Sequence, residues 1–205
     1  MAIKEKLYIT KKQVVQIICD YLEPLMTEND FKFIKTKDEF IKKTAFGHQE
    51  ISTNITSYWP LKQEVNIHIA TINYQINQIR TMFFCSAKKN NYTVSKWLVL
   101  PNSNELKYKE LYTSQDIEIA KQEAYELIKQ EAFNYLEKYS HLENNIEYTK
   151  NKKNSYFISI LLISLKPAKD SRYNEFKKEV INSINDQNSK LDQKENLFNL
   201  IEYLD

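Results

Sequence analysis

The fold is decided by residues 31–72, which read FKFIKTKDEFIKKTAFGHQEISTNITSYWPLKQEVNIHIATI. Apolar and polar side chains alternate along much of this stretch, and a period of two is typical of strands with one buried face. One phase predicts an apolar face made of Phe31, Phe33, Phe40, Ile55, Ile67 and Ile69. The other phase predicts a polar face made of Lys43, Ser52, Asn54, Thr56, Asn66 and His68.

The single glycine of the chain predicts where the central hairpin turns. Gly47 and His48 form a plausible two-residue turn, because glycine adopts positive φ without steric cost. A turn at this place pairs Phe40 with Ile55. Pro60 marks the next connection, since proline is favoured between strands rather than within them.

The flanking segments follow helical spacing. Thr10 and Gln13 form a capping-box pattern ahead of Val14, Ile18 and Leu22. Thr113 and Asp116 introduce a long amphipathic helix that reaches about residue 139. The apolar run 156–165 is interpreted as a buried helix that ends before Pro167, and two further helices are expected before the C-terminus.

These patterns predict an α+β fold. An antiparallel sheet of about five to six strands in the N-terminal half packs against helices, and the C-terminal half is helical. We expect residues 1–150 to form the sheet domain and residues 151–205 to form a helical extension on the same core, or the whole chain to form one domain. The polar stretch 149–154 is the expected boundary.

Charge and cysteine content restrict the class of protein. The chain holds 29 Lys+Arg and 27 Asp+Glu residues, whereas a dedicated nucleic-acid binder concentrates positive charge. Cys19 and Cys85 are expected to be free and buried. The N-terminal residues lack the apolar core of a signal peptide, so we expect a cytoplasmic protein that neither enters a membrane nor binds nucleic acid.

Glycine content excludes several common chemistries. One glycine cannot build a P-loop, a dinucleotide-binding G-x-G-x-x-G turn or a G-x-S-x-G nucleophile elbow. The three histidines, His48, His68 and His141, have no local zinc-binding spacing. We therefore predict no cofactor, no metal site and no recognisable catalytic residue.

The candidate binding surface is the polar face together with its aromatic rim. It comprises Lys43, Asn54, Tyr58, Trp59, Asn66 and His68. Tyr and Trp favour protein interfaces because they bury a large area at low entropic cost. Trp59 is also in phase with the apolar face, so a core position is the alternative for that residue.

Two other functions remain open on the sequence alone. One is an enzyme of unfamiliar class that uses His68 with Lys43 or a nearby carboxylate. The other is a nucleic-acid-associated protein that uses two lysine-rich loops, residues 88–92 and 150–156, because each combines lysines with a tyrosine.

The segment 31–79 resembles a family of uncharacterised bacterial domains. The resemblance rests on Asp30-Phe31-Lys32-Phe33, Phe40-Ile41-Lys42-Lys43 and Val65-Asn66-Ile67-His68-Ile69, and Asp30 stands where the family usually has glycine. Members of the family are α+β proteins, and some look like immunity proteins of bacterial toxin systems. Because recognisable catalytic motifs are missing and the aromatic-rich sheet offers a sizeable surface, we expect a non-enzymatic protein-binding module, and the resemblance extends this expectation to an immunity or regulatory protein.

Overall fold

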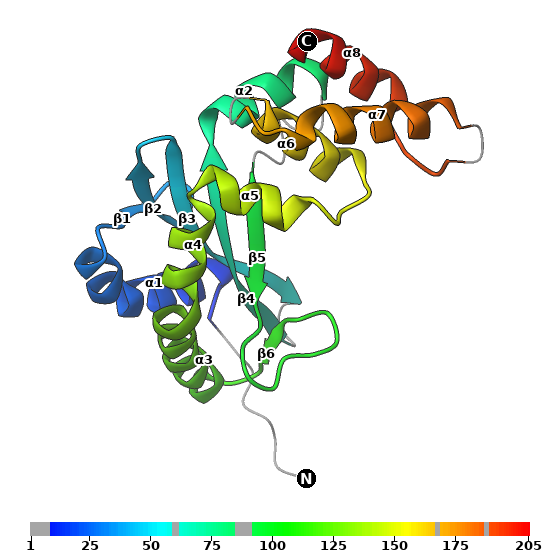
Figure 1. Ribbon diagram of the computed structural model, residues 1–205. Helices are drawn as coiled ribbons and strands as arrows, with labels where there is room; N and C mark the ends of the chain where they lie inside the picture. Colours follow the sequence, from blue (N-terminus) through cyan, green and yellow to red (C-terminus); the bar gives the residue numbers. More distant parts are fainter. Residues whose placement is uncertain (1–8, 59–61, 85–91, 167–168, 187–188) are drawn as a thin grey trace. The chain divides into compact units, whose positions relative to one another are not determined.

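The computed structural model describes residues 9–58, 62–84, 92–166, 169–186 and 189–205. The chain divides into two compact units, which interleave along the sequence (Figure 1). Unit 1 is Met1–Ala70 with Ser95–Glu137, and unit 2 is Thr71–Val94 with Lys138–Asp205. A domain boundary at residue 150 stays a prediction.

Unit 1 is built on a six-stranded antiparallel sheet, counted over the described residues. Its strands are β1 (Lys32–Ile34), β2 (Glu39–Thr44), β3 (Gly47–Tyr58), β4 (Lys62–Asn73), β5 (Val94–Leu98) and β6 (Lys109–Leu111). They lie in the order β1-β2-β3-β4-β5, and β6 pairs with β4. The predicted α+β class with an N-terminal antiparallel sheet is confirmed.

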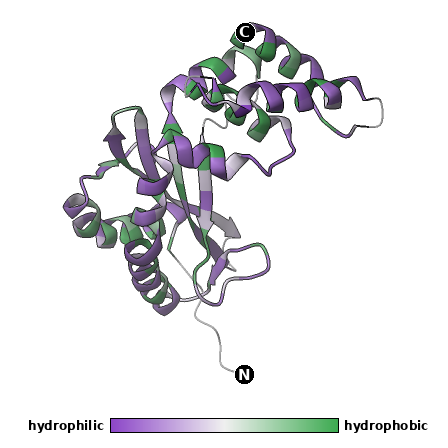
Figure 2. Ribbon diagram, viewed as in Figure 1, coloured by the Kyte–Doolittle hydropathy of each residue, from purple (hydrophilic) through white to green (hydrophobic). Residues whose placement is uncertain are grey.

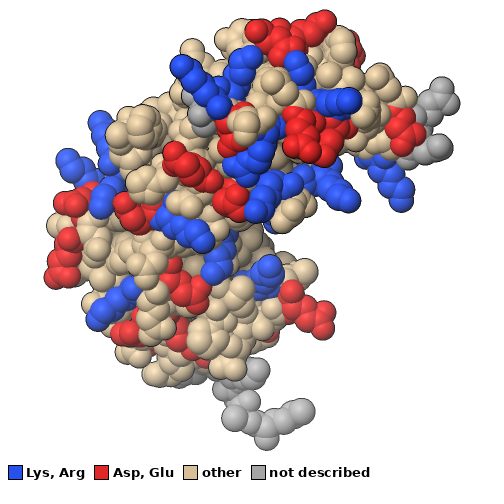
Figure 3. Space-filling model, in the orientation of Figure 1, with Lys and Arg blue, Asp and Glu red and all other residues tan. Residues whose placement is uncertain are grey.

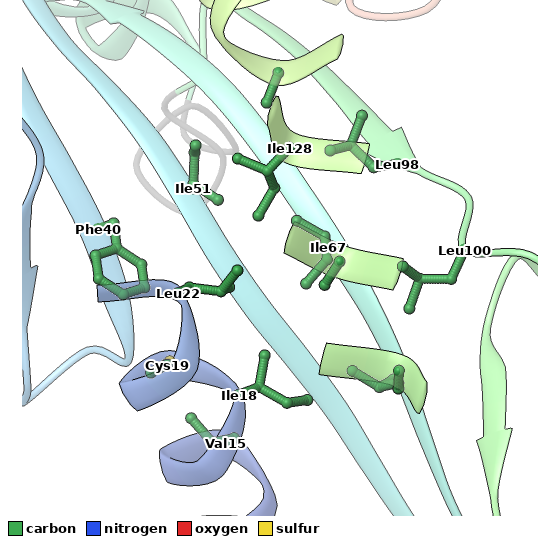
Figure 4. Packing of buried hydrophobic residues seen from close by; sticks show 14 of the residues in the cluster. Val15, Ile18, Cys19, Leu22, Phe40, Ile51, Ile67, Leu98, Leu100 and Ile128 are labelled. Atoms are coloured by element: carbon green, nitrogen blue, oxygen red, sulfur yellow. The ribbon is translucent and has the colours of Figure 1, made fainter. Parts of the chain in front are cut away.

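Two helical segments cover one face of this sheet. The first is α1 (Lys11–Glu28), and the second is α3 (Ser114–Leu127), which continues through a π-helical turn (Ile128–Ala132) into α4 (Phe133–Tyr139). Hydrophilic and hydrophobic residues occupy different sides of these helices (Figure 2). In the core, Ile18 and Leu22 of α1 point toward the sheet residue Ile51 (Figure 4).

Both of these helical segments start at the predicted capping boxes. The Thr10 hydroxyl accepts from the Gln13 backbone N–H at 3.3 Å, and the Thr113 hydroxyl accepts from Asp116 N–H at 3.2 Å. The side chains of Gln13 and Asp116 in turn accept from the backbone N–H groups of the two caps. Two helix-terminal donors are thereby satisfied at each start.

The end of α1 requires a left-handed residue directly ahead of the first strand. Phe31 N–H donates to Met26 O at 2.9 Å and Asp30 N–H donates to Thr27 O at 3.1 Å, which is the bonding pattern of a Schellman motif. The motif needs a left-handed residue, and Asp30 has φ 66°. Aspartate tolerates this conformation better than most residues that carry a Cβ atom.

The predicted register of the central hairpin is wrong. Gly47 pairs with Thr44, so the turn consists of Ala45 and Phe46, and Gly47 is a strand residue without positive φ. Phe40 therefore pairs with Ile51 rather than with Ile55. This register continues an apolar row from β1, because Phe40 also pairs with Phe33, with ring centroids 4.9 Å apart.

Unit 2 is a group of helices around its own apolar cluster. It contains α2 (Tyr74–Phe83), α5 (Leu142–Thr149), α6 (Ser155–Leu165), α7 (Arg172–Asn185) and α8 (Lys194–Leu204). The run predicted as a buried helix is α6, which is capped by Asn154 and buried from Ile158 to Leu165. Helix α5 was not predicted, since only Leu142 and Ile146 mark its apolar side.

A buried arginine links α2 to α6 within unit 2. Arg80 is 1% exposed, and its Nε donates to Ser159 Oγ at 3.2 Å. Its guanidinium lies 4.2 Å from the ring centroid of Tyr156, an arrangement that combines cation–π attraction with packing. Burial lowers the pKa of Arg80 from its usual value, although a guanidinium remains protonated in proteins.

Two further sequence predictions concern the thiols and the membrane. Cys19 is a free, buried thiol whose pKa is raised to about 12 by burial, while Cys85 lies outside the described residues. Within the part of the chain that the structure describes, no helix combines the length and the apolarity that crossing a bilayer requires.

We predict that Ile67→Ala lowers the free energy of unfolding by about 2–5 kcal/mol, because it empties a fully buried position between the helices and the sheet. Ile119→Ala, at a position that is 39% exposed, changes it by less than about 0.5 kcal/mol. Urea unfolding followed by tryptophan fluorescence measures both values. Equal effects of the two substitutions would contradict the core described here.

Candidate functional site

The polar face of the sheet lies opposite the side that the helices cover. Because Ile51 and Ile67 point into the core (Figure 4), their neighbours in β3 and β4 point the other way. We define the polar face by its residues in strands β2 to β5. These are Glu39 and Lys43 in β2; His48, Glu50, Ser52, Asn54 and Tyr58 in β3; Glu64, Asn66 and His68 in β4; and Trp97 in β5.

Two acceptor atoms on the central strands are buried and lack a hydrogen-bond donor among the described residues. They are Glu50 Oε1 and Asn66 Oδ1, and the two residues are only 6% and 2% exposed. The second carboxylate oxygen of Glu50 lies 3.9 Å from His48 Nε2, beyond hydrogen-bonding distance. An unpaired buried polar group lowers the folding stability by about 1–3 kcal/mol. A hydrogen bond donated by a ligand at this place is therefore favourable.

His68 packs against an aromatic side chain on the same face. Its ring centroid is 4.5 Å from that of Trp97, and the two planes are inclined by 50°. Burial lowers the pKa of His68, and the negative charge of Glu50 opposes this shift without cancelling it. The imidazole is therefore neutral at neutral pH, and the indole of Trp97 remains 41% exposed above it.

A further carboxylate adds negative charge near the centre. Glu39 of β2 pairs directly with Ser52 of β3, so its side chain belongs to the polar face. Burial, and next the repulsion from Glu50, raise the pKa of Glu39. A surface with these two carboxylates attracts cations and hydrogen-bond donors, and it repels phosphate groups.

An ion-pair network closes the end of the face at the β3–β4 connection. Lys62 Nζ lies 2.8 Å from Glu64 Oε1 and 2.5 Å from Glu110 Oε1, and 5.2 Å from the ring centroid of Tyr58. The Tyr112 hydroxyl donates to Glu110 Oε2 at 2.6 Å. The hydrogen bond from Lys62 is the main reason that the pKa of Glu110 is lowered. The network holds Lys62 in place while the ring of Tyr58 stays exposed.

Three of the predicted site residues lie on the two central strands. Asn66 and His68 are two positions apart on β4, and Asn54 lies on the adjacent β3, where its Nδ2 donates to Ser52 Oγ at 3.3 Å. The prediction that these three side chains point away from the core agrees with the structure. The two residues of β4 are nevertheless buried rather than open to solvent.

The other three predicted residues are more dispersed. Lys43 lies on β2 and is separated from His68 by the whole of β3, about 10 Å away at the usual strand spacing. Tyr58 lies at the end of β3, beside Lys62. Trp59 falls outside the described residues.

Glu50 and Trp97 were not among the predicted site residues. Glu50 has the same phase as Ser52 and Asn54, but the expected turn at residues 47–48 placed it near the hairpin end instead of within a paired strand. Trp97 lies in β5, where alternation along residues 94–98 separates it from the buried Val94 and Leu98. In both cases, the pairing of the strands was needed to place the residue in the candidate site.

Three cavities lie on other parts of the molecule. One of about 470 Å³ is lined by α1 and β1, one of about 350 Å³ lies beside α3, and one of about 470 Å³ belongs to unit 2. His68 lines none of these three. Among the residues that the structure describes, no three His, Cys, Asp or Glu side chains are grouped as metal ligands.

No family model, curated protein or solved structure matches this chain.

We predict that Glu50→Gln raises the free energy of unfolding by about 1 kcal/mol at neutral pH, because it removes a buried charge that has no hydrogen-bonding donor. Glu131→Gln is the matched control, since that carboxylate is exposed and pairs with Lys96. The control shifts the value by less than about 0.5 kcal/mol. A destabilised Glu50→Gln variant in chemical denaturation would show that the carboxylate is satisfied in the native protein.

We also predict that His68 makes stability fall in acid. The pKa of His68 is lowered in the folded state, so folding favours the neutral ring. The resulting contribution to stability is fully present above the unfolded-state pKa of about 6.5. Protonation of the unfolded chain removes it as the pH falls below that value. Denaturation measured between about pH 8 and about pH 5 should show a weaker pH dependence for His68→Gln than for the wild type. Parallel curves for the two proteins would refute the prediction.

Proposed function

We propose that the chain is a non-enzymatic protein-binding module and that the polar face of unit 1 contacts its partner. One observation carries the proposal: Glu50 Oε1 and Asn66 Oδ1 are buried acceptors without a described donor, and the exposed Trp97 lies on the same face. The two acceptors are covered in the free protein, so a partner side chain donates hydrogen bonds to them only after the groups above them move aside, whereas the exposed indole contributes apolar area directly.

The charge of the face indicates the chemistry of the partner. Glu39 and Glu50 lie close enough for the charge of one to raise the pKa of the other. An arginine or lysine side chain offers both positive charge and several N–H donors, whereas a nucleic acid brings phosphates that the carboxylates repel. We therefore propose a basic segment of another protein as the partner.

An enzyme based on His68 is the second candidate. It is supported by the neutral imidazole and the neighbouring Glu50, because a neutral histidine with a carboxylate nearby is suited to accept a proton. Lys43 does not belong to this group, as β3 lies between β2 and β4. The binding proposal is preferred because the aromatic ring of Trp97 already occupies the space beside the imidazole.

A nucleic-acid-associated function has less support. It would use two lysine-rich loops. Lys88 and Lys89 of the first loop lie outside the described residues, and the second loop, residues 150–156, belongs to unit 2.

An immunity or regulatory role in the cytoplasm fits this proposal. A protein that occludes its partner needs a preformed surface and no catalytic group, and the resemblance of residues 31–79 to immunity-like domains points the same way. The free thiol of Cys19 is consistent with a reducing compartment.

The test is affinity capture from native cells followed by titration of the purified partner. We expect one stoichiometric partner whose affinity falls at least about tenfold with Trp97→Ala and with Glu50→Gln. Phe198→Ala is the control, because Phe198 has a matching exposure of 43% but lies on α8 in unit 2.

Circular dichroism establishes that each variant is folded. Undiminished affinity in both polar-face variants, or failure to recover any stoichiometric partner, would contradict the proposal.

A further inference from the structure

Unit 2 contains a cavity of about 470 Å³ that the proposed function does not use. It is formed by four segments of the same unit: the turn after α5, the first turn of α6, the middle of α7, and the residues that precede α8. Its lining comprises Lys150, Asn151, Lys152, Lys153, Ile158, Phe176, Glu179, Val180, Ser183, Ser189, Lys190 and Leu191. A volume of this size accommodates a small organic molecule.

The cavity has an apolar floor. Ile158 of α6 and Val180 of α7 are buried members of the unit 2 core, and the partly buried Phe176 and Leu191 pack against the same cluster. A ligand that enters the cavity therefore meets hydrocarbon side chains beside the polar groups of the lining. Transfer of an apolar group to such a floor is favourable by about 25 cal/mol for each Å² removed from water.

The rim of the cavity is positively charged. Four lysines and one glutamate line it, and Lys and Arg side chains gather along the turn after α5 in Figure 3. Lys150 already pairs with Glu147 of α5. Neither Lys153 nor Lys190 forms an ion pair with any residue that the structure describes, so their charges are available to a ligand.

One rim lysine is held in position by aromatic rings. The ammonium of Lys152 lies 5.1 Å from the ring centroid of Tyr148 and 5.3 Å from that of Phe157. The two rings are themselves in edge contact, with centroids 5.9 Å apart. Cation–π attraction thus fixes a positive charge beside the apolar floor before a ligand arrives.

The geometry points to a binding site for an amphiphilic anion, a molecule with a hydrocarbon body and a carboxylate or phosphate head. The body occupies the floor formed by Ile158 and Val180, and the head lies among Lys152, Lys153 and Lys190. Glu179 disfavours the negative head, since it is the single acidic residue of the described lining. The site is independent of the polar face in unit 1.

Calorimetric titration of the full chain with decanoate tests the assignment. We expect saturable binding of one decanoate, and at least about tenfold weaker binding of decanol and decylamine, which keep the hydrocarbon and lose the negative charge. Decyl phosphate is titrated in parallel. Tighter binding of the phosphate identifies a phosphate head as the preferred one, and tighter binding of decanoate identifies a carboxylate.

Charge variants locate the site. Lys153→Glu with Lys190→Glu weakens decanoate binding at least about tenfold, whereas Glu179→Gln tightens it by about threefold. Lys178→Glu is the matched control, because Lys178 is exposed on α7 and lies outside the lining. Equal affinities for decanoate and decanol, or equal loss in the control and the double variant, would overturn the assignment.

Discussion

Contact between one apolar row of the sheet and helices α1 and α3 fixes the character of both faces of unit 1. Phe40 pairs with Ile51, and Ile51 and Ile67 meet Ile18 and Leu22 in the core. Because strand side chains alternate, burying this row forces every intervening residue onto the opposite face. The polar face is thus a direct consequence of how the core packs, whatever its residues later bind.

The polar face carries features that stability alone does not explain. An outer face that served only to be solvated would not require a buried carboxylate with an unpaired oxygen, as at Glu50. Nor would it require an exposed indole packed at an angle against a neutral imidazole, as at Trp97 and His68. Groups that cost folding free energy are typical of binding sites, where a ligand supplies the missing interactions.

Hydrophobic alternation predicted the two faces of the sheet, but it did not predict which residues are paired. The expected and observed registers of the hairpin differ by four residues, and an even shift leaves each side chain on the same face. Phe40 therefore faces the core in both, while Glu50 lies two residue pairs farther from the turn than expected. Local capping signals at Thr10 and Thr113 were reliable because their hydrogen bonds involve residues three positions apart. Burial of the polar face depends on tertiary contacts, which no local pattern contains.

Cross-strand disulfide trapping tests the central claim most directly, because the hairpin register sets which residues of β2 lie beside Glu50 and the other polar-face residues of β3. Residues paired across antiparallel strands have Cα atoms about 4.5–5.5 Å apart, within the range that a disulfide spans. Lys43 pairs with His48, whereas Ser52 pairs with Glu39. The account predicts that mild oxidation links the Lys43→Cys/His48→Cys double variant and leaves the Lys43→Cys/Ser52→Cys variant reduced. The reverse result, read by mass spectrometry of the digested protein, would contradict it.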